Sequence, residues 1–359
     1  MSVRIEKVAE SELKAKPDQG DLGFGVHFTD HMLVMSYREG DGWQEPLIKK
    51  YENFSLDPAA MALHYGQAIF EGLKAYRGKD DLIYLFRPED NLHRMNDSAT
   101  RMCMPNIPVS EVLEAMKKLL DLDRDWVPGT LGATLYVRPT MIATEAALGV
   151  RPALEYLFFI ILSPVGAYYA EGFNPVKIYV TDDYVRAVRG GVGNVKTAGN
   201  YAASIMAALE AQGKGYTQVL WLDAIERKYV EEIGTSNIFF MINNELVTPA
   251  LSGSILPGIT RDSVIKLSQD WGIKVAEREI SIDEVIAALE DGSLQEAFAS
   301  GTAAVISPVG ALNYKGKEFA INGEQTGQLA QRLFDELQGI QFGEGEDPFD
   351  WRLSIDQGS

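Results

Sequence analysis

The segment GGVGNVKTAGNYAAS, residues 190–204, places one lysine, Lys196, among small residues directly before a helical pattern. Glycine and alanine flank this lysine on both sides and leave space around its amine. In apolar, glycine-lined surroundings the pKa of a lysine falls, and the neutral amine can attack a carbonyl carbon to form a Schiff base. Lysines are mostly exposed, so the segment alone favours a loop lysine in solvent.

Two glycine-rich stretches resemble nucleotide-binding motifs, and both lack the required spacing. In GLKAYRGK, residues 72–79, five residues separate the glycines where a P-loop has four, and Asp80 replaces Ser or Thr. After Gly191 and Gly193, Lys196 stands where a dinucleotide fingerprint needs its third glycine. The sequence therefore argues against a P-loop nucleotide-binding protein and against an NAD-dependent amino acid dehydrogenase.

The composition is that of a folded protein with a small-molecule partner. The chain has 359 residues, enough for two domains with separate cores, and 46% of them are hydrophobic. A net charge of −18 disfavours nucleic acid and anionic lipid as partners. The single cysteine, Cys103, excludes an intramolecular disulfide and offers no zinc-binding pair, so we expect no metal. No apolar stretch predicts a secretory signal or membrane span, and we expect a cytoplasmic protein.

Apolar periodicity predicts a mixed α/β (α+β) protein. Strands are expected at 81–86, 133–142, 155–162, 218–222, 237–242 and 303–308. Helices are expected at 88–102, 111–121, 200–212, 260–270, 282–290 and 327–339. Turn-forming residues in SPVGAYYAEGFNP, residues 163–175, separate two strand patterns. We therefore predict an N-terminal domain over 1–166, an interdomain loop over 167–176 and a C-terminal domain over 177–359 that carries Lys196.

Eight segments carry a resemblance to a known family. They are FGVHFTDHM (24–32), LHYGQAIFEGLKAYRG (63–78), LFRPEDNLHRMNDSATRMCMP (85–105), TLYVRP (134–139), GVGNVKTAGNY (191–201), EEIGTSNIFF (231–240), LPGITRDSV (256–264) and FASGTAAV (298–305). This set resembles the branched-chain amino acid aminotransferases, pyridoxal-phosphate enzymes of fold type IV. The resemblance implies a smaller N-terminal α/β domain and a larger C-terminal domain with a β-barrel-like core and surrounding helices.

The resemblance also implies which residues hold pyridoxal 5'-phosphate. Lys196 matches the Schiff-base lysine, which also moves a proton at the substrate Cα. Glu232 matches the carboxylate that faces the pyridine nitrogen. The residues alone do not decide between Glu231 and Glu232 for this role, and a solvated acidic pair is the alternative for both. Tyr201 matches the tyrosine that hydrogen-bonds the cofactor's 3′-oxygen. The implied phosphate-binding groups are Arg94, with Arg101 as the competing arginine, the backbone N–H groups of Ile259 and Thr260 at a helix N-terminus, Thr302 and Arg186.

Substrate residues follow from the same resemblance. Phe24, Phe70 and Tyr168 are expected to line an apolar pocket, and a partner subunit is expected to add Tyr65, Leu148 and Val150 to it in an obligatory homodimer. Plain core packing is the alternative for each of them. Tyr136 and Arg138 alternate with Val137 on a predicted strand and therefore share a face. Tyr136 would hold the substrate α-carboxylate together with backbone N–H groups near Thr302 and Ala303. Arg138 would bind the γ-carboxylate of glutamate.

The resemblance implies reversible transfer of the amino group of L-leucine, L-isoleucine or L-valine to 2-oxoglutarate. A D-amino-acid aminotransferase or an aminodeoxychorismate lyase would use a similar lysine, glutamate and phosphate site. Relatives of that kind tend to be shorter and to lack the FTDHM and HYGQAIFEGLKAYRG segments. A noncatalytic protein of the same fold is a further alternative, since fold alone does not imply activity. The joint presence of Lys196, Tyr201, Glu232 and Arg94 argues against it.

Overall fold

Contacts within the chain divide it into two compact units, each with its own sheet. The computed structural model describes residues 2–130, 132–166 and 173–355. The first unit comprises residues 1–168, 196–198 and 338–359, and the second comprises residues 169–195 and 199–337. Residues 167–172 of the predicted interdomain loop lie outside the described residues, so that loop stays a prediction. Residues 196–198 and 338–359, which we assigned to the C-terminal domain, group with the first unit instead.

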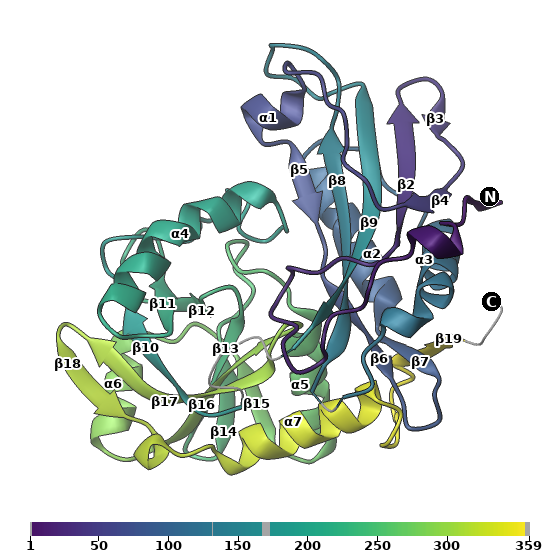
Figure 1. The fold of residues 1–359 in the computed structure, drawn as a ribbon. Helices are drawn as coiled ribbons and strands as arrows, with labels where there is room; N and C mark the ends of the chain where they lie inside the picture. The colour runs from purple at the N-terminus through teal and green to yellow at the C-terminus, as the bar shows by residue number, and fades with distance from the viewer. Residues whose placement is uncertain (1, 131, 167–172, 356–359) are drawn as a thin grey trace. The chain divides into compact units, whose positions relative to one another are not determined.

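The first unit contains a ten-stranded sheet in the order β1-β4-β2-β9-β8-β6-β7-β19, with β3 added to β2 and β5 to β8 (Figure 1). Its pairings are antiparallel except for β1 with β4. The strands are β1 Arg4–Ile5, β2 His31–Arg38, β3 Gly42–Trp43, β4 Leu47–Lys50, β5 Ala68–Phe70, β6 Leu73–Arg77, β7 Ile83–Phe86, β8 Thr134–Ala143, β9 Glu155–Val165 and β19 Arg352–Ile355. Its helices are α1 Met61–Tyr65, α2 Pro88–Arg101 and α3 Val109–Leu122, with short 3-10 turns at Glu10–Glu12 and Arg124–Trp126.

Helices α2 and α3 pack together and bury their apolar faces in the core of the first unit. Pro88 occupies the first turn of α2, where its missing N–H costs nothing, and Arg101 lies in the last turn, where a cation is favourable. Leu92, Met95 and Ala99 are fully buried on this helix. Their spacing of three and four residues is that of one helical face, which explains why the sequence pattern predicted both helices.

The C-terminal residues add the last strand to this sheet. β19 pairs antiparallel with β7, with Arg352 opposite Phe86, and Trp351 packs edge-on against Phe86 at 5.6 Å between ring centres. The predicted domain boundary missed this because the pairing joins strands far apart in the sequence. A four-residue strand carries too little alternation to reveal its partner.

The second unit contains a nine-stranded mixed sheet in the order β12-β11-β10-β17-β16-β13-β14-β15, with β18 added to β17. The strands are β10 Val176–Val180, β11 Gln218–Leu222, β12 Val230–Ile233, β13 Asn237–Ile242, β14 Glu245–Thr248, β15 Lys274–Glu277, β16 Leu294–Gly301, β17 Val305–Tyr314 and β18 Lys317–Ala320. The helices are α4 Ala198–Gly213, α5 Ile259–Asp270, α6 Ile282–Glu290 and α7 Gln328–Gln341, with a 3-10 turn at Asn322–Glu324. Helix α7 begins in this unit and its last residues belong to the first.

The elements match the expected mixed α/β class, and the predicted helices lie where the pattern placed them. Among the expected strands the main difference is β17, which extends to Tyr314, beyond the expected end at 308. The pattern did not predict helix α1 or thirteen of the strands in the described ranges, β2 and β16 among them. No helix in the described ranges has the length and hydropathy that crossing a bilayer requires. Among the same residues, no cluster of three or more His, Cys, Asp or Glu side chains is placed to hold a metal ion.

Candidate active site

Lys196 lies on a short extended segment that pairs with strand β5. The backbone N–H of Phe70 donates to the carbonyl oxygen of Lys196 at 3.1 Å, and Thr197 forms an isolated antiparallel bridge with Ile69. The hydroxyl of Thr197 donates to the carbonyl oxygen of Ala68 at 2.9 Å. These bonds fix the backbone from which the Lys196 side chain extends.

The Lys196 amine is held in surroundings that favour its neutral form. Burial lowers the pKa of Lys196 from 10.5 to about 8; the charge of Arg94 adds to this effect and the carboxylate of Glu71 opposes it. Nζ lies 5.0 Å from the centre of the Phe70 ring. The alternative of a solvated loop lysine is therefore wrong for Lys196, whose amine can act as a nucleophile near neutral pH.

Arg94 extends from α2 and is paired with a buried carboxylate, Glu71. Nε and Nη2 of Arg94 donate to the two carboxylate oxygens at 2.8 and 2.9 Å, and neither side chain is more than 8% exposed. Burial alone would raise the pKa of Glu71, but the charge and hydrogen bonds of Arg94 hold it below its ordinary range. The sequence pattern did not indicate Glu71, which stands as an acid between strands β5 and β6.

Tyr136 and Arg138 share one face of strand β8, as their alternation predicted. Nη2 of Arg138 donates to the Tyr136 hydroxyl at 3.3 Å, and Phe24 packs edge-on against Tyr136 with ring centres 5.2 Å apart. The Arg138 guanidinium lies 4.7 Å from the centre of the Phe70 ring. Nε of Arg138 is buried without a hydrogen-bond partner among the described residues. The free Nε donor of this guanidinium can bind a carboxylate, and the aromatic rings beside it can contact an apolar group of the same ligand.

Lys74 is a second buried amine that the sequence analysis did not identify. It lies opposite Tyr136 in the pairing of β6 with β8, and burial lowers the pKa of Lys74 to about 8. Close by, a Cβ on Gly72 would lie 2.0 Å from the Tyr136 hydroxyl oxygen, so glycine leaves room for that hydroxyl. In the sequence Lys74 is one of two basic residues of β6, and the pattern gave no sign of its burial.

In the second unit, Arg186, Tyr201 and Glu232 line one pocket. The other lining residues are Asn200, Ser204, Gly234, Thr235 and Leu256. Nη2 of Arg186 forms an ion pair with Glu232 and donates to the carbonyl oxygen of Gly193 at 2.9 Å. Asn237 donates to Glu232 at 3.3 Å. The pocket therefore contains a buried carboxylate and a phenol, and Arg186 holds the carboxylate in place.

Both acids of the Glu231–Glu232 pair are buried, so the alternative of a solvated pair is wrong. They are consecutive residues of β12 and point to opposite faces of the strand. Burial raises the pKa of Glu231, which accepts a hydrogen bond from the hydroxyl of Ser254. Of these two residues, Glu232 lines the pocket with Tyr201.

Ile259 and Thr260 are the first two residues of α5, so their backbone N–H groups lie at a helix N-terminus as expected. Gly258 precedes them, and a Cβ at that position would lie 2.0 Å from the side-chain oxygen of Asn237. Thr302 and Ala303 form the turn between β16 and β17 and are partly buried. These groups all belong to the second unit.

The three residues expected from a partner subunit are exposed. Tyr65 ends α1 and is 40% exposed; Leu148 and Val150 are 72% and 87% exposed. A bridge between Ala60 and Ala146 brings the two chain segments side by side. Plain core packing, the alternative for these residues, is therefore wrong. The remaining predicted pocket residue, Tyr168, lies outside the described residues.

The family model described as "Amino-transferase class IV" matches residues 68–312, which is more than half of the chain and includes Lys196, Arg94 and Glu232. The chain belongs to the class IV aminotransferases. This result confirms the family that the eight sequence segments indicated.

Relatives of this class IV aminotransferase match it over nearly its whole length. It is 54% identical to branched-chain-amino-acid aminotransferase 2 of Bacillus subtilis over 99% of this chain and 97% of that protein. It is 52% identical to a probable branched-chain-amino-acid aminotransferase of Staphylococcus epidermidis over 99% of each chain.

Solved structures confirm the expected fold type IV architecture. The branched-chain amino acid aminotransferase of Escherichia coli matches with a TM-score of 0.75 and 27% identity, over 90% of this chain and 99% of that one. The branched-chain aminotransferase of the archaeon Thermoproteus uzoniensis, solved with norvaline, matches with a TM-score of 0.74 and 26% identity, over 91% of this chain and 100% of that one.

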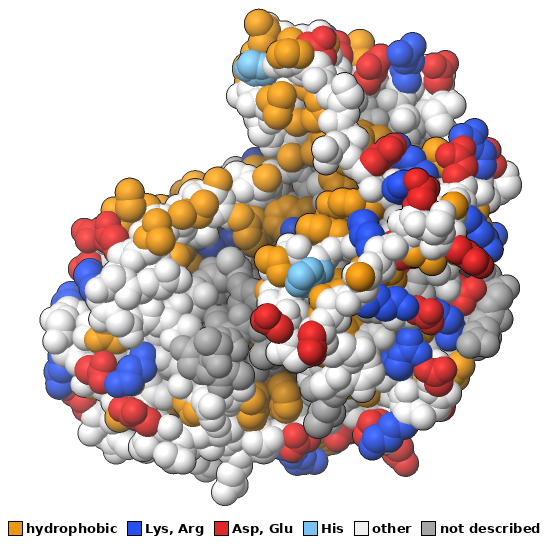
Figure 2. Space-filling view, viewed as in Figure 1, with side chains coloured by type: hydrophobic (Ala, Val, Ile, Leu, Met, Phe, Trp, Pro, Cys, Tyr) orange, Lys and Arg blue, Asp and Glu red, His pale blue; other side chains and the backbone are white. Residues whose placement is uncertain are grey.

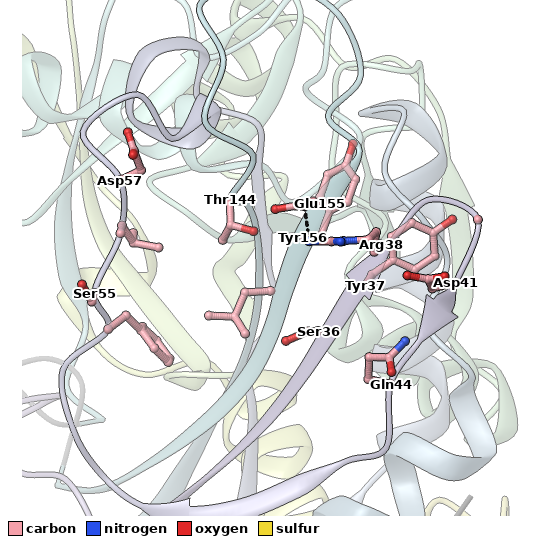
Figure 3. Close-up of a pocket in the computed structure, with 14 residues that line it drawn as sticks. Ser36, Tyr37, Arg38, Asp41, Gln44, Ser55, Asp57, Thr144, Glu155 and Tyr156 are labelled. Carbon is pink, nitrogen blue, oxygen red and sulfur yellow. Dashed lines mark ion pairs between the residues drawn. The ribbon is translucent and has the colours of Figure 1, made fainter.

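The aminotransferase also has an open groove on its first unit, apart from the predicted site residues (Figure 3). It is lined by parts of β2 and β9, by residues 54–57 and by Thr144. Its one arginine, Arg38, forms an ion pair with Glu155 at 2.7 Å. No predicted cofactor or substrate residue lines it, so we assign it no part in the reaction.

Proposed function

We propose that this class IV aminotransferase moves the amino group of L-leucine, L-isoleucine or L-valine to 2-oxoglutarate, with pyridoxal 5'-phosphate as its cofactor. The observation that carries the proposal is 54% identity, over almost the whole chain, to a branched-chain-amino-acid aminotransferase. Solved relatives were crystallised with pyridoxamine 5'-phosphate and with a phosphopyridoxyl-glutamate adduct. The activity and the cofactor that the sequence led us to expect are thereby confirmed.

The residues present fit this cofactor. Its aldehyde needs an amine, which Lys196 supplies with a lowered pKa. Its ring nitrogen needs a carboxylate, and its 3′-oxygen a donor; Glu232 and Tyr201 line one pocket. Its phosphate needs cationic and N–H donors, and Arg94 and the start of α5 offer both types.

In the proposed mechanism Lys196 has two tasks. It holds the cofactor covalently through its neutral amine, and after release it takes up and returns a proton at the substrate Cα. When bound, pyridoxal phosphate supplies an electron sink for the carbanion at that carbon. The negative charge of Glu232 would keep the ring nitrogen protonated, and the ion pair with Arg186 holds the Glu232 carboxylate in place.

For the cofactor's phosphate we propose Arg94, the backbone N–H groups of Ile259 and Thr260, and Thr302. Arg186 was a further candidate on sequence grounds. In the structure it donates to Glu232 and to the carbonyl of Gly193, and this favours a role beside the carboxylate over a role at the phosphate.

For the substrate we propose an aromatic pocket with a polar exit. Phe24 and Phe70 pack near Tyr136 and Arg138. The rings can therefore contact an apolar substrate side chain, and the guanidinium can bind a γ-carboxylate. Tyr136 and the backbone N–H of Ala303 are proposed to hold the α-carboxylate, and Arg138 the γ-carboxylate of glutamate. Tyr168 keeps its proposed place in the pocket on resemblance alone.

We further propose that the protein acts as a homodimer in the cytoplasm, with Tyr65, Leu148 and Val150 completing the partner's pocket. The support is a set of exposed apolar side chains on the first unit, Leu63, Tyr65, Leu148, Val150 and Leu154, which we propose form one patch. In the second unit α4 also exposes Ile205, Met206 and Leu209, each more than half accessible (Figure 2). Apolar faces of this kind are typical of subunit interfaces.

Absorbance of the two half-reactions tests the proposal. Purified protein is mixed with pyridoxal phosphate, then with L-leucine, then with 2-oxoglutarate. We expect a visible band that shifts to shorter wavelength with leucine and returns with the oxo acid. A band that ignores leucine but responds to D-alanine would favour the D-amino-acid aminotransferase alternative, and absence of any band would contradict the cofactor assignment.

A further inference from the structure

The buried face of α2 carries a polar stripe as well as an apolar one. Asn91, Arg94 and Ser98 follow each other at intervals of three and four residues, and each is at least nine-tenths buried. Burying three polar side chains on one helical face is costly unless each finds a partner. Their partners identify what this face is built to hold.

The partner at the start of the stripe is Glu71, which is fully buried. Four donors surround its carboxylate: Nε and Nη2 of Arg94, the side-chain amide of Asn91 at 2.9 Å and the backbone N–H of Gly72 at 3.1 Å. The bidentate contact fixes the plane of the Arg94 guanidinium, since both carboxylate oxygens are engaged. Asn91 and Gly72 in turn fix the carboxylate.

The partner at the other end of the stripe is the backbone of Lys196. The Ser98 hydroxyl accepts a hydrogen bond from the N–H of Lys196 at 3.0 Å and donates to the carbonyl oxygen of Arg94 at 3.1 Å. One helical face therefore holds both Arg94 and the start of the Lys196 side chain.

We infer that Glu71 is a positioning residue for the cofactor's phosphate, which it serves by orienting Arg94, and that Ser98 is a positioning residue for Lys196. This inference rests on the proposed function, because it takes Arg94 as a phosphate ligand. In this role Glu71 acts through Arg94 and is assigned no contact of its own with phosphate or substrate. Its negative charge also offsets part of the positive charge that Arg94 places near Lys196.

The test compares two cofactor forms, pyridoxal phosphate and pyridoxal without phosphate, by equilibrium binding to cofactor-free protein. Glu71→Gln keeps the size of the side chain and removes its charge. We expect it to weaken binding of pyridoxal phosphate at least about tenfold, since a misplaced charged donor loses a charge-assisted bond, and to change pyridoxal binding much less. Ser98→Ala should weaken binding of both forms to a similar degree, because both need Lys196.

Three controls keep the test decisive. Glu89→Gln removes a carboxylate from the exposed side of α2 and should leave both affinities unchanged. Glu71→Gln combined with Arg94→Gln should bind pyridoxal phosphate no more weakly than Arg94→Gln alone, because the two residues act in series. Asn91→Ala takes the place of Glu71→Gln if that variant does not fold. It loosens Glu71 without leaving a buried charge unpaired, and we expect a smaller loss of affinity that is selective for pyridoxal phosphate.

The outcomes separate this inference from the proposed function. If the unaltered protein binds neither cofactor form, the proposed function fails. If it binds pyridoxal phosphate while Glu71→Gln, or Asn91→Ala in its place, weakens both forms equally or neither, the role assigned to Glu71 is wrong. Equal affinities of Ser98→Ala and the unaltered protein would overturn the role assigned to Ser98.

Discussion

Because burial lowers the pKa of Lys196 to about 8, its capture of pyridoxal phosphate should depend on pH in a characteristic way. Only the neutral amine attacks the aldehyde, so the rate should rise with pH and level off above about pH 8. An exposed lysine would give a rate that rises towards its ordinary pKa of 10.5. Stopped-flow absorbance of cofactor-free protein measures this profile, and a continued rise to about pH 10 would contradict the burial of the amine.

Glu231 and Glu232 offer a matched pair of substitutions on one strand. Glu232→Gln should lower kcat about a hundredfold or more, because the charge that keeps the ring nitrogen protonated is lost. Glu231→Gln should leave kcat close to that of the unaltered protein, because burial raises the pKa of Glu231 and Ser254 is its hydrogen-bond partner. Steady-state kinetics with leucine compares them. The reverse order would mean that the two roles have been exchanged.

The sequence indicated the geometry of some proposed site residues and missed that of others, for physical reasons. Tyr136 and Arg138 were placed on one face because alternation along a strand is local. Glu71 and Lys74 were missed because a charged residue in or beside a strand is usually exposed, and its burial depends on distant partners such as Arg94 and on neighbouring strands. The ion pair of Arg186 with Glu232 was missed for the same reason.

Among the elements, the loop that leads to Lys196 depends on close packing at Gly193. A Cβ there would lie 2.2 Å from the carbonyl oxygen of Ser254 and 2.4 Å from the Cβ of Ala187. Gly193→Ala should therefore displace the loop, cost about 1–3 kcal/mol in the free energy of unfolding and weaken cofactor binding. Denaturant unfolding and absorbance titration measure the two effects.

Gly199→Ala is the matched control for that substitution. Gly199 lies in the first turn of α4 and a Cβ there would meet nothing within 4 Å. Alanine is the better helix former, so this variant should be as stable as the unaltered protein or more stable by up to about 1 kcal/mol. Equal losses in both variants would show that the Gly193 contact is not what constrains the loop.

Six of the seven α-helices in the described ranges, and long buried strands such as β8 and β9, were predictable because their signals are local. The α2 and α3 patterns show apolar residues at helical spacing, and α5 begins at Ile259, one residue before its expected start. The strand β19 was not predictable, because its four residues form a strand by pairing with β7, which lies far from them in the sequence. Helix α1 is only five residues long and ends at Gly66 with a φ of 63°, too short for a periodic pattern.

At the scale of the whole molecule, the proposed homodimer predicts where a surface charge will matter. Val150→Glu should shift the protein towards monomers and lower its activity, because a carboxylate would be buried in the interface beside the partner's pocket. Ile225→Glu introduces the same charge at a residue that is 78% exposed on the second unit and outside the proposed patch. Sedimentation velocity and activity should be unchanged in that control. A dimer that tolerates Val150→Glu would place the interface elsewhere.

We propose that Lys196 and pyridoxal phosphate together carry an amino group from a branched-chain amino acid to 2-oxoglutarate. The most direct measurement follows isotope-labelled nitrogen from L-leucine into glutamate by mass spectrometry, in the unaltered protein and in Lys196→Ala. We predict labelled L-glutamate and the oxo acid of leucine in equal amounts from the unaltered protein, and none above background from Lys196→Ala. Labelled nitrogen released as ammonia, or transfer that persists without Lys196, would contradict the account.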